Sequence, residues 1–417
     1  MLLKIRKELK DSQTFLTFGV MGGLGMIAPL VIAKFFSESL FGSYSLARVI
    51  IFLFLSILFS PTQTPFIVCS NQERTQSGKI NKSFSVQLIF FAFSIAASAV
   101  LSLIFNKAIM AFAQISFPDL LFMMLALVAI ITQSFISSLF MSLGQRLKNA
   151  TIELIFGVVN LIIVILLCLT GRITLSSVFF ASFLSEIVVI LAAIWMVDYK
   201  MLLPLKFDRE HFRNMFGYSR LLILSSASTY LIDWGGNFVL RPLVGMAQIG
   251  NFNLGYQIFK GITMLIALIN NYFLPFVSEH IKDPAVMKNY LFNKRPKIFI
   301  AGLLGTGFLF VAAPYILSLI YGNAYKGSDM VLLILLIGCV FVLYNSFYIP
   351  ILNALKEFKF NVIVNIIQSI LSIALSVFLV SRFGILGAAV ATTIAYFFTT
   401  VVFEAYYRIK LKKILIA

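Results

Sequence analysis

Charged residues are scarce in this sequence. Lys, Arg, Asp and Glu together make up only 12% of its 417 residues, whereas a typical soluble domain carries roughly 25%. Hydrophobic residues reach 60%, against roughly 45–50% in soluble domains. Because a soluble protein needs a polar surface, this composition excludes a soluble fold and indicates that lipid is the outer solvent of the chain.

Cysteine and histidine are also rare, and their positions argue against several kinds of site. The two histidines, His211 and His280, fall in basic loops, which disfavours a paired catalytic or metal-binding role. The three cysteines lie far apart, in or beside apolar runs, without the spacing of metal ligands: Cys69, Cys168 and Cys339. We therefore interpret the cysteines as core residues and expect neither a metal site nor any cofactor.

Segments that could hold a nucleotide or a catalytic domain are missing as well. The sequence has no Gly-x-x-x-x-Gly-Lys-Ser/Thr loop, and its longest cytoplasmic segment, about residues 198–216, is too short for a nucleotide-binding domain. The chain itself therefore has no means of using ATP. The loops expected on the opposite side are shorter still, which disfavours an enzyme that needs a large outer loop for its substrate.

Long apolar runs are abundant instead, and they predict an all-α polytopic membrane protein. A run of about 20 apolar residues spans the hydrocarbon core as a helix, whereas a β-barrel shows short strands of alternating polarity. The apolar stretch Phe15–Phe36 is too long for a signal-peptide core, so we expect it to be retained as the first span. We predict twelve transmembrane helices, at about residues 14–34, 45–69, 84–106, 118–143, 151–170, 174–197, 217–241, 248–277, 298–321, 328–354, 361–381 and 384–407.

The basic residues between these helices alternate in number from side to side. One set of loops, with both chain ends, holds 25 of the 33 Lys and Arg residues, the opposite set holds six, and Arg48 and Lys260 lie inside spans. Basic residues favour the cytoplasmic side of a membrane, so both termini are predicted to be cytoplasmic. The net charge of +17 is spread over seven short segments rather than one patch, which argues against nucleic-acid binding.

The two halves of the sequence repeat one another. Gly42–Ala47 (Gly-Ser-Tyr-Ser-Leu-Ala) matches Gly250–Gly255 (Gly-Asn-Phe-Asn-Leu-Gly) at an offset of 208 residues. Two further matches occur at nearly the same offset: Pro65-Phe66 with Pro275-Phe276, and Leu147-Lys148 with Phe358-Lys359. Six helices per half is an even number, so both halves share one orientation, as in a parallel repeat about an axis along the membrane normal. We predict two six-helix lobes, residues 1–206 and 207–417, related by a pseudo-two-fold.

Two cations lie at similar depth inside the predicted spans, where a charged side chain costs free energy unless it faces a cavity or a partner. Lys260 lies about ten residues, or about 15 Å, inside the eighth helix, too deep to reach the headgroups easily. The repeat aligns it with Phe52, one turn beyond Arg48. Two such cations across a water-filled cavity would attract an anionic group such as a diphosphate.

Each candidate substrate-binding residue also has a plainer interpretation, which the sequence leaves open. Arg48 could extend to the outer headgroups, and Lys260 could pair with Asp233 of the neighbouring helix. Asp233 is then either that partner or a proton-coupling carboxylate. Arg241 sits at the outer rim, where it could serve only to position the chain, and Glu186 lies somewhat deeper in the sixth helix.

Two further acidic residues, Glu153 and Glu404, lie near the cytoplasmic ends of their helices. We interpret both as interfacial residues, because a carboxylate near the end of a span can reach water. They are therefore left out of the candidate substrate-binding set.

Several segments, in order along the chain, resemble one known family. Asp233, Val244-Gly245 and Ile249–Tyr256 resemble the seventh-to-eighth helix signature of polysaccharide-exporting flippases. Leu319–Ser328 resembles their outer loop between helices nine and ten, and Gly384–Thr392 resembles the start of their last helix. Together these segments are similar to the O-antigen flippase (Wzx) type within the multidrug/oligosaccharidyl-lipid/polysaccharide (MOP) exporter superfamily.

This resemblance implies a MATE/MurJ-like fold and a function beyond what composition shows. Such flippases move a polyprenyl-diphosphate-linked oligosaccharide, here an undecaprenyl-diphosphate-linked O-antigen unit, to the periplasmic leaflet of the bacterial inner membrane by alternating access between two lobes. Related flippases line the cavity with cations from early helices and the eighth helix, a pattern that Arg48 and Lys260 fit. The first helix here has no basic residue before Lys34, so polar groups are expected to share the sugar contacts.

The resemblance also implies partners and leaves alternatives. The expected partners are the lipid-linked oligosaccharide, membrane lipid, an O-antigen polymerase and a chain-length regulator, while the protein itself is expected to be a monomer. Any uphill movement is expected to draw on an ion gradient. A drug/ion antiporter of the same superfamily and a membrane glycan polymerase remain the competing interpretations.

Overall fold

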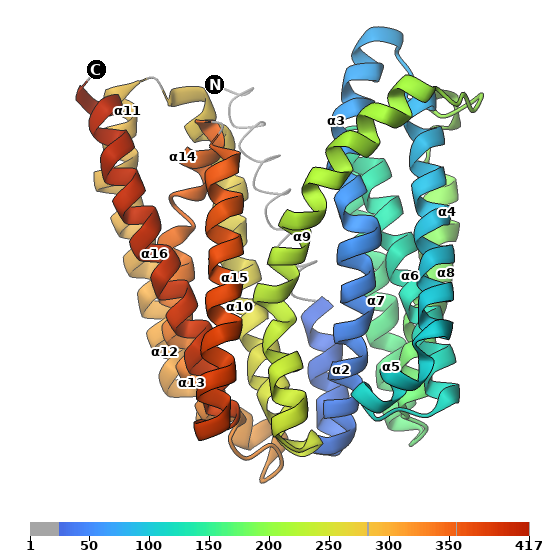
Figure 1. Ribbon diagram of the computed structural model, residues 1–417, viewed down its shortest axis with the longest axis vertical. Helices are drawn as coiled ribbons and strands as arrows, with labels where there is room; N and C mark the ends of the chain where they lie inside the picture. Colours follow the sequence, from blue (N-terminus) through green and yellow to red (C-terminus); the bar gives the residue numbers. More distant parts are fainter. Residues whose placement is uncertain (1–24, 282, 356, 417) are drawn as a thin grey trace. The chain divides into compact units, whose positions relative to one another are not determined.

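The chain folds into helices joined by short loops (Figure 1). The computed structural model describes residues 25–416 apart from 282 and 356. Within this part every regular element is a helix and no β-strand occurs, so the predicted all-α class is confirmed. The helices group into two compact units. Unit 1 contains Ser43–Tyr230 with the described residues up to Phe35, and unit 2 contains Phe36–Gly42 with the described residues from Leu231 on.

Unit 1 is built on a long helical segment with one irregular turn. Its three parts are α2 (Glu38–Phe54), a π-helical turn (Leu55–Phe59) and α3 (Ser60–Ser77). Pro61 follows the turn and has no backbone N–H to continue the regular hydrogen-bond pattern. The Ser94 hydroxyl donates a hydrogen bond of 2.9 Å to the Leu58 carbonyl. A side chain thus satisfies a backbone group next to the irregular turn.

The rest of unit 1 is a bundle of apolar helices. They are α4 (Asn81–Ile104), α5 (Asn106–Ala113), α6 (Phe117–Ser142), α7 (Arg146–Leu169), α8 (Leu175–Met196) and the first part of α9 (Arg209–Leu243). Capping boxes start two of them, Ser116 with Asp119 at α6 and Thr174 with Ser177 at α8. α6, α7 and α8 pack against one another, and this three-helix contact encloses several polar side chains described below.

Unit 2 is a second bundle. After the end of α9 come α10 (Met246–His280), α11 (Pro284–Asn289), a π-helical turn (Tyr290–Lys294), α12 (Arg295–Tyr321), α13 (Ser328–Asn345), α14 (Ile349–Ala354), α15 (Phe358–Phe383) and α16 (Ile385–Ile416). α10 packs on α13, and α16 packs on both α13 and α15. The boundaries after Gly42 and after Tyr230 fall inside α2 and α9, and the boundary after Phe35 lies at the bend before α2. The lobe boundary predicted between residues 206 and 207 stays a prediction.

The described residues include ten helical segments that are long and apolar enough to cross a membrane. They correspond to ten of the predicted spans, so a multi-pass helical membrane protein is confirmed. The predicted span at about residues 14–34 lies largely outside the described residues. The predicted span at about residues 217–241 is helical as part of α9, but Arg220, Asp233 and several Ser and Thr residues make that helix less apolar. The number twelve therefore stays a prediction.

Candidate functional site

An ion pair lies deep along α10 in unit 2. The Lys260 ammonium lies 2.6 Å from Asp233 Oδ1 of α9. Lys260 is fourteen residues after Met246, the first residue of α10, or about 21 Å along the helix. The two side chains are 24% and 23% exposed, so the pair is partly open. Of the two interpretations left open by the sequence, the pairing of Lys260 with Asp233 is thus present, and substrate contact stays a prediction.

A second polar pair joins the same two helices. Asn253 Nδ2 donates to Asn237 Oδ1 at 2.7 Å and to the Ile249 carbonyl at 2.9 Å. Asn237 lies one turn after Asp233 on α9, and Asn253 lies two turns before Lys260 on α10, so the two pairs follow one antiparallel seam. In an apolar bundle such a seam fixes the rotation of one helix against the other, because each polar group needs its partner.

Aromatic rings surround this seam. The Tyr256 ring stacks on Phe252 with centroids 5.6 Å apart, and lies 5.6 Å from Phe259 and 6.4 Å from Trp234. The Tyr256 hydroxyl is buried and has no hydrogen-bond partner in the part of the chain that the structure describes. Trp234, the residue after Asp233, is partly buried, and Tyr256 lies one turn before Lys260 on α10. The site therefore combines charge with flat apolar surface.

Arg48 lies in unit 1, on α2. Its guanidinium carbon is 5.6 Å from the centroid of the Tyr44 ring and 5.4 Å from that of Phe52. These distances are within the range of a cation–π contact, so Arg48 is held on one face of α2 and is partly buried. Arg48 and Lys260 belong to different units, and the predicted cooperation between them stays a prediction.

The other two candidates occupy different settings. Arg241 lies in the last turn of α9 and is partly buried. Glu186 lies near the middle of α8 in unit 1 and is only 2% exposed. Lys260 and Asp233 are in direct contact, and substrate binding by Arg241 and Glu186 stays a prediction.

The sequence reasoning missed a polar cluster where the starts of α2, α10 and α13 meet in unit 2. The Glu38 carboxylate accepts a hydrogen bond from the Tyr325 backbone N–H at 2.9 Å and lies 3.5 Å from Asn251 Nδ2. The Ser328 hydroxyl donates to the Asn251 carbonyl at 2.8 Å, and the Tyr325 hydroxyl donates to the Phe36 carbonyl at 3.1 Å. Burial raises the pKa of the Tyr325 hydroxyl, which therefore stays protonated and able to donate. The available sequence signals were the repeat segment Gly250–Gly255, which contains Asn251, and the segment Leu319–Ser328, which contains Tyr325 and Ser328.

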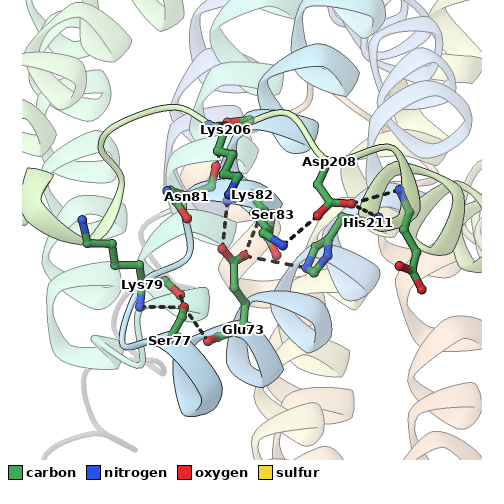
Figure 2. Close-up of polar contacts among 11 residues, drawn as sticks. Glu73, Ser77, Lys79, Asn81, Lys82, Ser83, Lys206, Asp208 and His211 are labelled. Carbon is green, nitrogen blue, oxygen red and sulfur yellow. Dashed lines mark hydrogen bonds and ion pairs between the residues drawn. The ribbon is translucent and has the colours of Figure 1, made fainter.

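Glu73 organises a second cluster that the sequence reasoning missed, in unit 1 (Figure 2). Its carboxylate accepts hydrogen bonds of 2.9 Å from the backbone N–H groups of Lys82 and Ser83 at the start of α4. His211 Nε2 lies 3.8 Å from Glu73 Oε2. A carboxylate at a helix N-terminus stabilises the unpaired backbone donors there. The lone acidic residue in an otherwise basic stretch was the available sequence signal.

The same cluster fastens the connection between α8 and α9 to unit 1 (Figure 2). Lys82 Nζ lies 2.7 Å from Asp208 Oδ2, and the hydrogen bond from Lys82 holds the pKa of Asp208 down at about 2. Four further hydrogen bonds join this connection to residues 79–85. They run from Lys79 Nζ to the Leu203 carbonyl at 3.1 Å, from Asn81 Nδ2 to the Pro204 carbonyl at 2.9 Å, from the Ile80 N–H to the Met201 carbonyl at 2.9 Å, and from the Lys206 N–H to the Ser85 hydroxyl at 3.0 Å. The connection is thus a fixed part of unit 1.

Metal ligands do not gather in the described part of the chain. No group of three or more His, Cys, Asp or Glu side chains is placed to hold a metal ion there. The three cysteines are buried and unbonded to one another, as the interpretation of core residues predicts.

Comparisons with known proteins agree with this architecture. A family model described as "Polysaccharide biosynthesis protein" matches residues 31–329. The capsular polysaccharide biosynthesis protein CapF of Staphylococcus aureus is 26% identical over 203 residues, 47% of this chain and 50% of CapF. The probable low-salt glycan biosynthesis flippase Agl15 of Haloferax volcanii is 24% identical over 205 residues, 46% of this chain and 42% of Agl15. The matched region thus spans about half the length of these relatives.

Solved structures share the fold over nearly the whole chain. An inward-facing multidrug resistance MATE family transporter of the MOP superfamily superimposes with a TM-score of 0.76 at 12% identity, covering 96% of this chain and 98% of that one. The lipid II flippase MurJ in an inward closed conformation gives a TM-score of 0.72 at 18% identity, covering 98% and 90%. The MATE/MurJ-like fold expected from the sequence resemblance is confirmed.

Proposed function

The chain belongs to the family of polysaccharide biosynthesis proteins, and from this premise we propose that it is a flippase for a lipid-linked oligosaccharide. The observation that carries the proposal is the Lys260–Asp233 pair, a partly open charge pair about 21 Å along a membrane helix and beside aromatic rings. A charged pair at such depth is expensive in a purely structural role. It is useful where a charged, hydroxyl-rich headgroup has to cross.

The substrate that fits best is a polyprenyl-diphosphate-linked glycan, with an undecaprenyl-diphosphate-linked O-antigen unit as the specific proposal. Support comes from the sequence resemblance to O-antigen flippases and from the relative Agl15, which is described as a probable glycan biosynthesis flippase. A protein is needed because the diphosphate and the many sugar hydroxyls lose their water on entering hydrocarbon. The lipid tail can stay in the bilayer throughout.

The residue roles follow from this chemistry. Lys260 and Arg48 would attract the diphosphate, and Asp233 would hold Lys260 in place until the anionic group competes for it. Trp234 would offer a flat face to a sugar ring, and Arg241 would act at the rim of the passage. The protein would work in the bacterial inner membrane with both termini in the cytoplasm, by alternating access between two lobes and with coupling to an ion gradient. An O-antigen polymerase and a chain-length regulator would take the product onward.

Gene deletion tests this function. In a strain without a redundant flippase, deletion should abolish surface glycan and leave lipid-linked units in the cytoplasmic leaflet. Complementation with the wild-type chain should restore display, and complementation with Lys260→Ala should not. Normal display of the glycan in the deletion strain would contradict the proposal.

The same strain separates the two alternatives. A drug/ion antiporter predicts changed resistance to cationic dyes with normal glycan display. A membrane glycan polymerase predicts single repeat units on the surface in place of long chains. The proposal requires that no repeat units reach the surface at all.

A further inference from the structure

Unit 1 holds a carboxyl group with no hydrogen-bond partner among the described residues. Glu186 lies near the middle of α8, about 15 Å from the end of that helix at Met196. The residue is only 2% exposed, and neither Oε1 nor Oε2 accepts a hydrogen bond within the described part of the chain. An ionised carboxylate without donors is strongly disfavoured in such surroundings. The group is therefore neutral in this conformation, which means that it carries a proton.

One polar side chain of α7 lies near this carboxyl group, and two of α6 lie near that neighbour in turn. Glu153 of α7 interacts electrostatically with Glu186, and Gln133 and Ser137 of α6 lie close to Glu153. Gln133 is 8% exposed, and the geometry leaves both of its amide atoms without a hydrogen bond to any described residue. We call Gln133, Ser137, Glu153 and Glu186 the Glu186 cluster. Glu186 itself could take up or release a proton without breaking a hydrogen bond to any described residue.

A row of polar groups leads from the start of α7 to the Glu186 cluster. Gln145, Asn149 and Glu153 are spaced four residues apart, so they share one face of the chain as it enters α7. Gln145 Oε1 and Asn149 Oδ1 are buried and lack partners within the described residues. Lys148 Nζ donates to the Met196 carbonyl at 2.6 Å, which holds the start of α7 against the end of α8. The row thus begins where the start of α7 meets the end of α8, and it extends along α7 to about the depth of Glu186.

The surroundings of Glu186 contain few other charged or titratable groups. From α7 it faces Glu153. α6 places the neutral Gln133 and Ser137 beside Glu153, while Asp119 at the far end of α6 is bound to Ser176, ten residues before Glu186. α2 approaches α8 at Tyr44, whose ring lies 5.7 Å from that of Phe179, and Arg48 lies one turn further along α2. Glu153 is therefore the chief charged neighbour of Glu186, and an ionised Glu153 disfavours ionisation of Glu186 as well.

We propose that Glu186 is a proton-binding site, reached from the start of α7 through Gln145, Asn149 and Glu153. The step is a simple exchange: water on one side of the membrane delivers a proton to the row, the proton binds the Glu186 carboxylate to give the neutral acid, and it leaves to water on the other side when the carboxyl group is opened there. Proton binding by Glu186 does not depend on the proposed function. Only the coupling of that proton to transport rests on the proposed function. One proton bound per cycle then links movement of the glycan lipid to a proton gradient.

Infrared difference spectroscopy on the full-length protein in lipid tests the site without any transport substrate. At pH 7 the wild-type protein should show a carbonyl band of a neutral carboxylic acid that is absent in Glu186→Gln. The band should remain, at a shifted frequency, in Glu153→Gln, and should be unchanged in the matched control Glu404→Gln, whose carboxylate already pairs with Arg408 at 2.7 Å.

Three outcomes overturn the site. They are a wild-type spectrum without such a band at pH 7, an identical band in Glu186→Gln, and loss of the band when sodium chloride is added at constant pH, which would assign the site to sodium. If Glu186→Gln does not fold, the wild-type spectrum and its response to sodium decide alone.

Proteoliposomes that contain a lipid-linked oligosaccharide test the coupling. For one proton per cycle, a gradient of one pH unit should change the distribution of the substrate between leaflets by up to about tenfold, and Glu186→Gln should remove this dependence. Flipping that ignores the gradient in the wild-type protein overturns the coupling. Absence of any flipping would contradict the proposed function and leave the proton site to the spectroscopic result.

Discussion

Gly42 and Gly250 meet in a reciprocal contact. A Cβ atom on Gly42 would lie 2.3 Å from the Met246 carbonyl oxygen, and a Cβ atom on Gly250 would lie 2.0 Å from the Glu38 carbonyl oxygen. Met246 precedes Gly250 by four residues, and Glu38 precedes Gly42 by four. Each glycine therefore fits against the carbonyl one turn before the other. The offset of 208 residues between them is that of the sequence repeat, so a local two-fold relates the starts of α2 and α10.

Replacing Gly250 by alanine tests this close contact. The added methyl group has no space, so the two helix ends must move apart, and we expect a loss of about 1–3 kcal/mol in stability. Gly307→Ala is the matched control, since a Cβ atom there meets nothing within 4 Å. Thermal unfolding of both variants in detergent gives the comparison. Equal unfolding temperatures would contradict the contact.

For the stability of the folded protein, the hydrogen bond that Glu38 accepts should matter more than its negative charge. Glu38→Ala leaves the Tyr325 backbone N–H without its acceptor, which we expect to cost about 1–3 kcal/mol. Glu38→Gln keeps one oxygen acceptor and should retain most of the stability. Unfolding temperatures, together with labelling of a cysteine placed at Ser328, report whether the cluster opens. Similar behaviour of the two variants would mean that the hydrogen bond contributes little.

Single and double variants separate the two roles of the Lys260–Asp233 pair. Lys260→Ala alone leaves a carboxylate without its cation, and we expect a loss of about 1–3 kcal/mol for a pair that is about a quarter exposed. The double variant Lys260→Met with Asp233→Asn should restore the protein level. If Lys260 binds the diphosphate, surface glycan stays absent in the double variant.

Lys107→Ala serves as the control for that experiment, because Lys107 is an exposed lysine on α5. It should leave glycan display unchanged. Restored display in the double variant would assign the pair a purely structural role.

The loss of stability at acid pH should depend on Asp208. Its pKa is lowered from 3.8 to about 2 in the folded protein, chiefly by the hydrogen bond from Lys82. A depressed carboxyl pKa contributes stability above the unfolded value, and this contribution is lost as pH falls through the folded value. The unfolding temperature should therefore drop between about pH 4 and about pH 2, with a smaller drop in Asp208→Asn.

Much of the membrane architecture could be predicted from the sequence, since it rests on apolar length alone. Ten predicted spans have helical, apolar counterparts among the described residues. The 208-residue repeat predicted equivalent positions for Gly42 and Gly250, and their contact agrees with that equivalence. The pairing of Lys260 with Asp233 was foreseen as one alternative, because a deep cation needs a partner.

The polar clusters could not be predicted, because they depend on which segments meet in space. Glu38 and Tyr325 are 287 residues apart, and no periodicity in the sequence links them. Glu153 was interpreted as interfacial from its place near a helix end, whereas its partners are set by the packing of α6 and α8 around it. Glu186 gives no local sign of lacking hydrogen-bond donors, since that depends on three helices at once.

The fastening of residues 199–208 leaves the connection between α8 and α9 without slack. It cannot serve as a loose tether, because its backbone is bonded to Lys79, Ile80, Asn81 and Ser85. α9 starts directly after Asp208 and runs unbroken past Tyr230 into unit 2. Because the connection is fixed, any rotation of α9 after Asp208 has to be taken up by twisting of the helix itself. The adjacent Gly235 and Gly236 make the helix easier to twist at that point. Asp233 lies two residues before these glycines, so such a twist would move its carboxylate relative to Lys260.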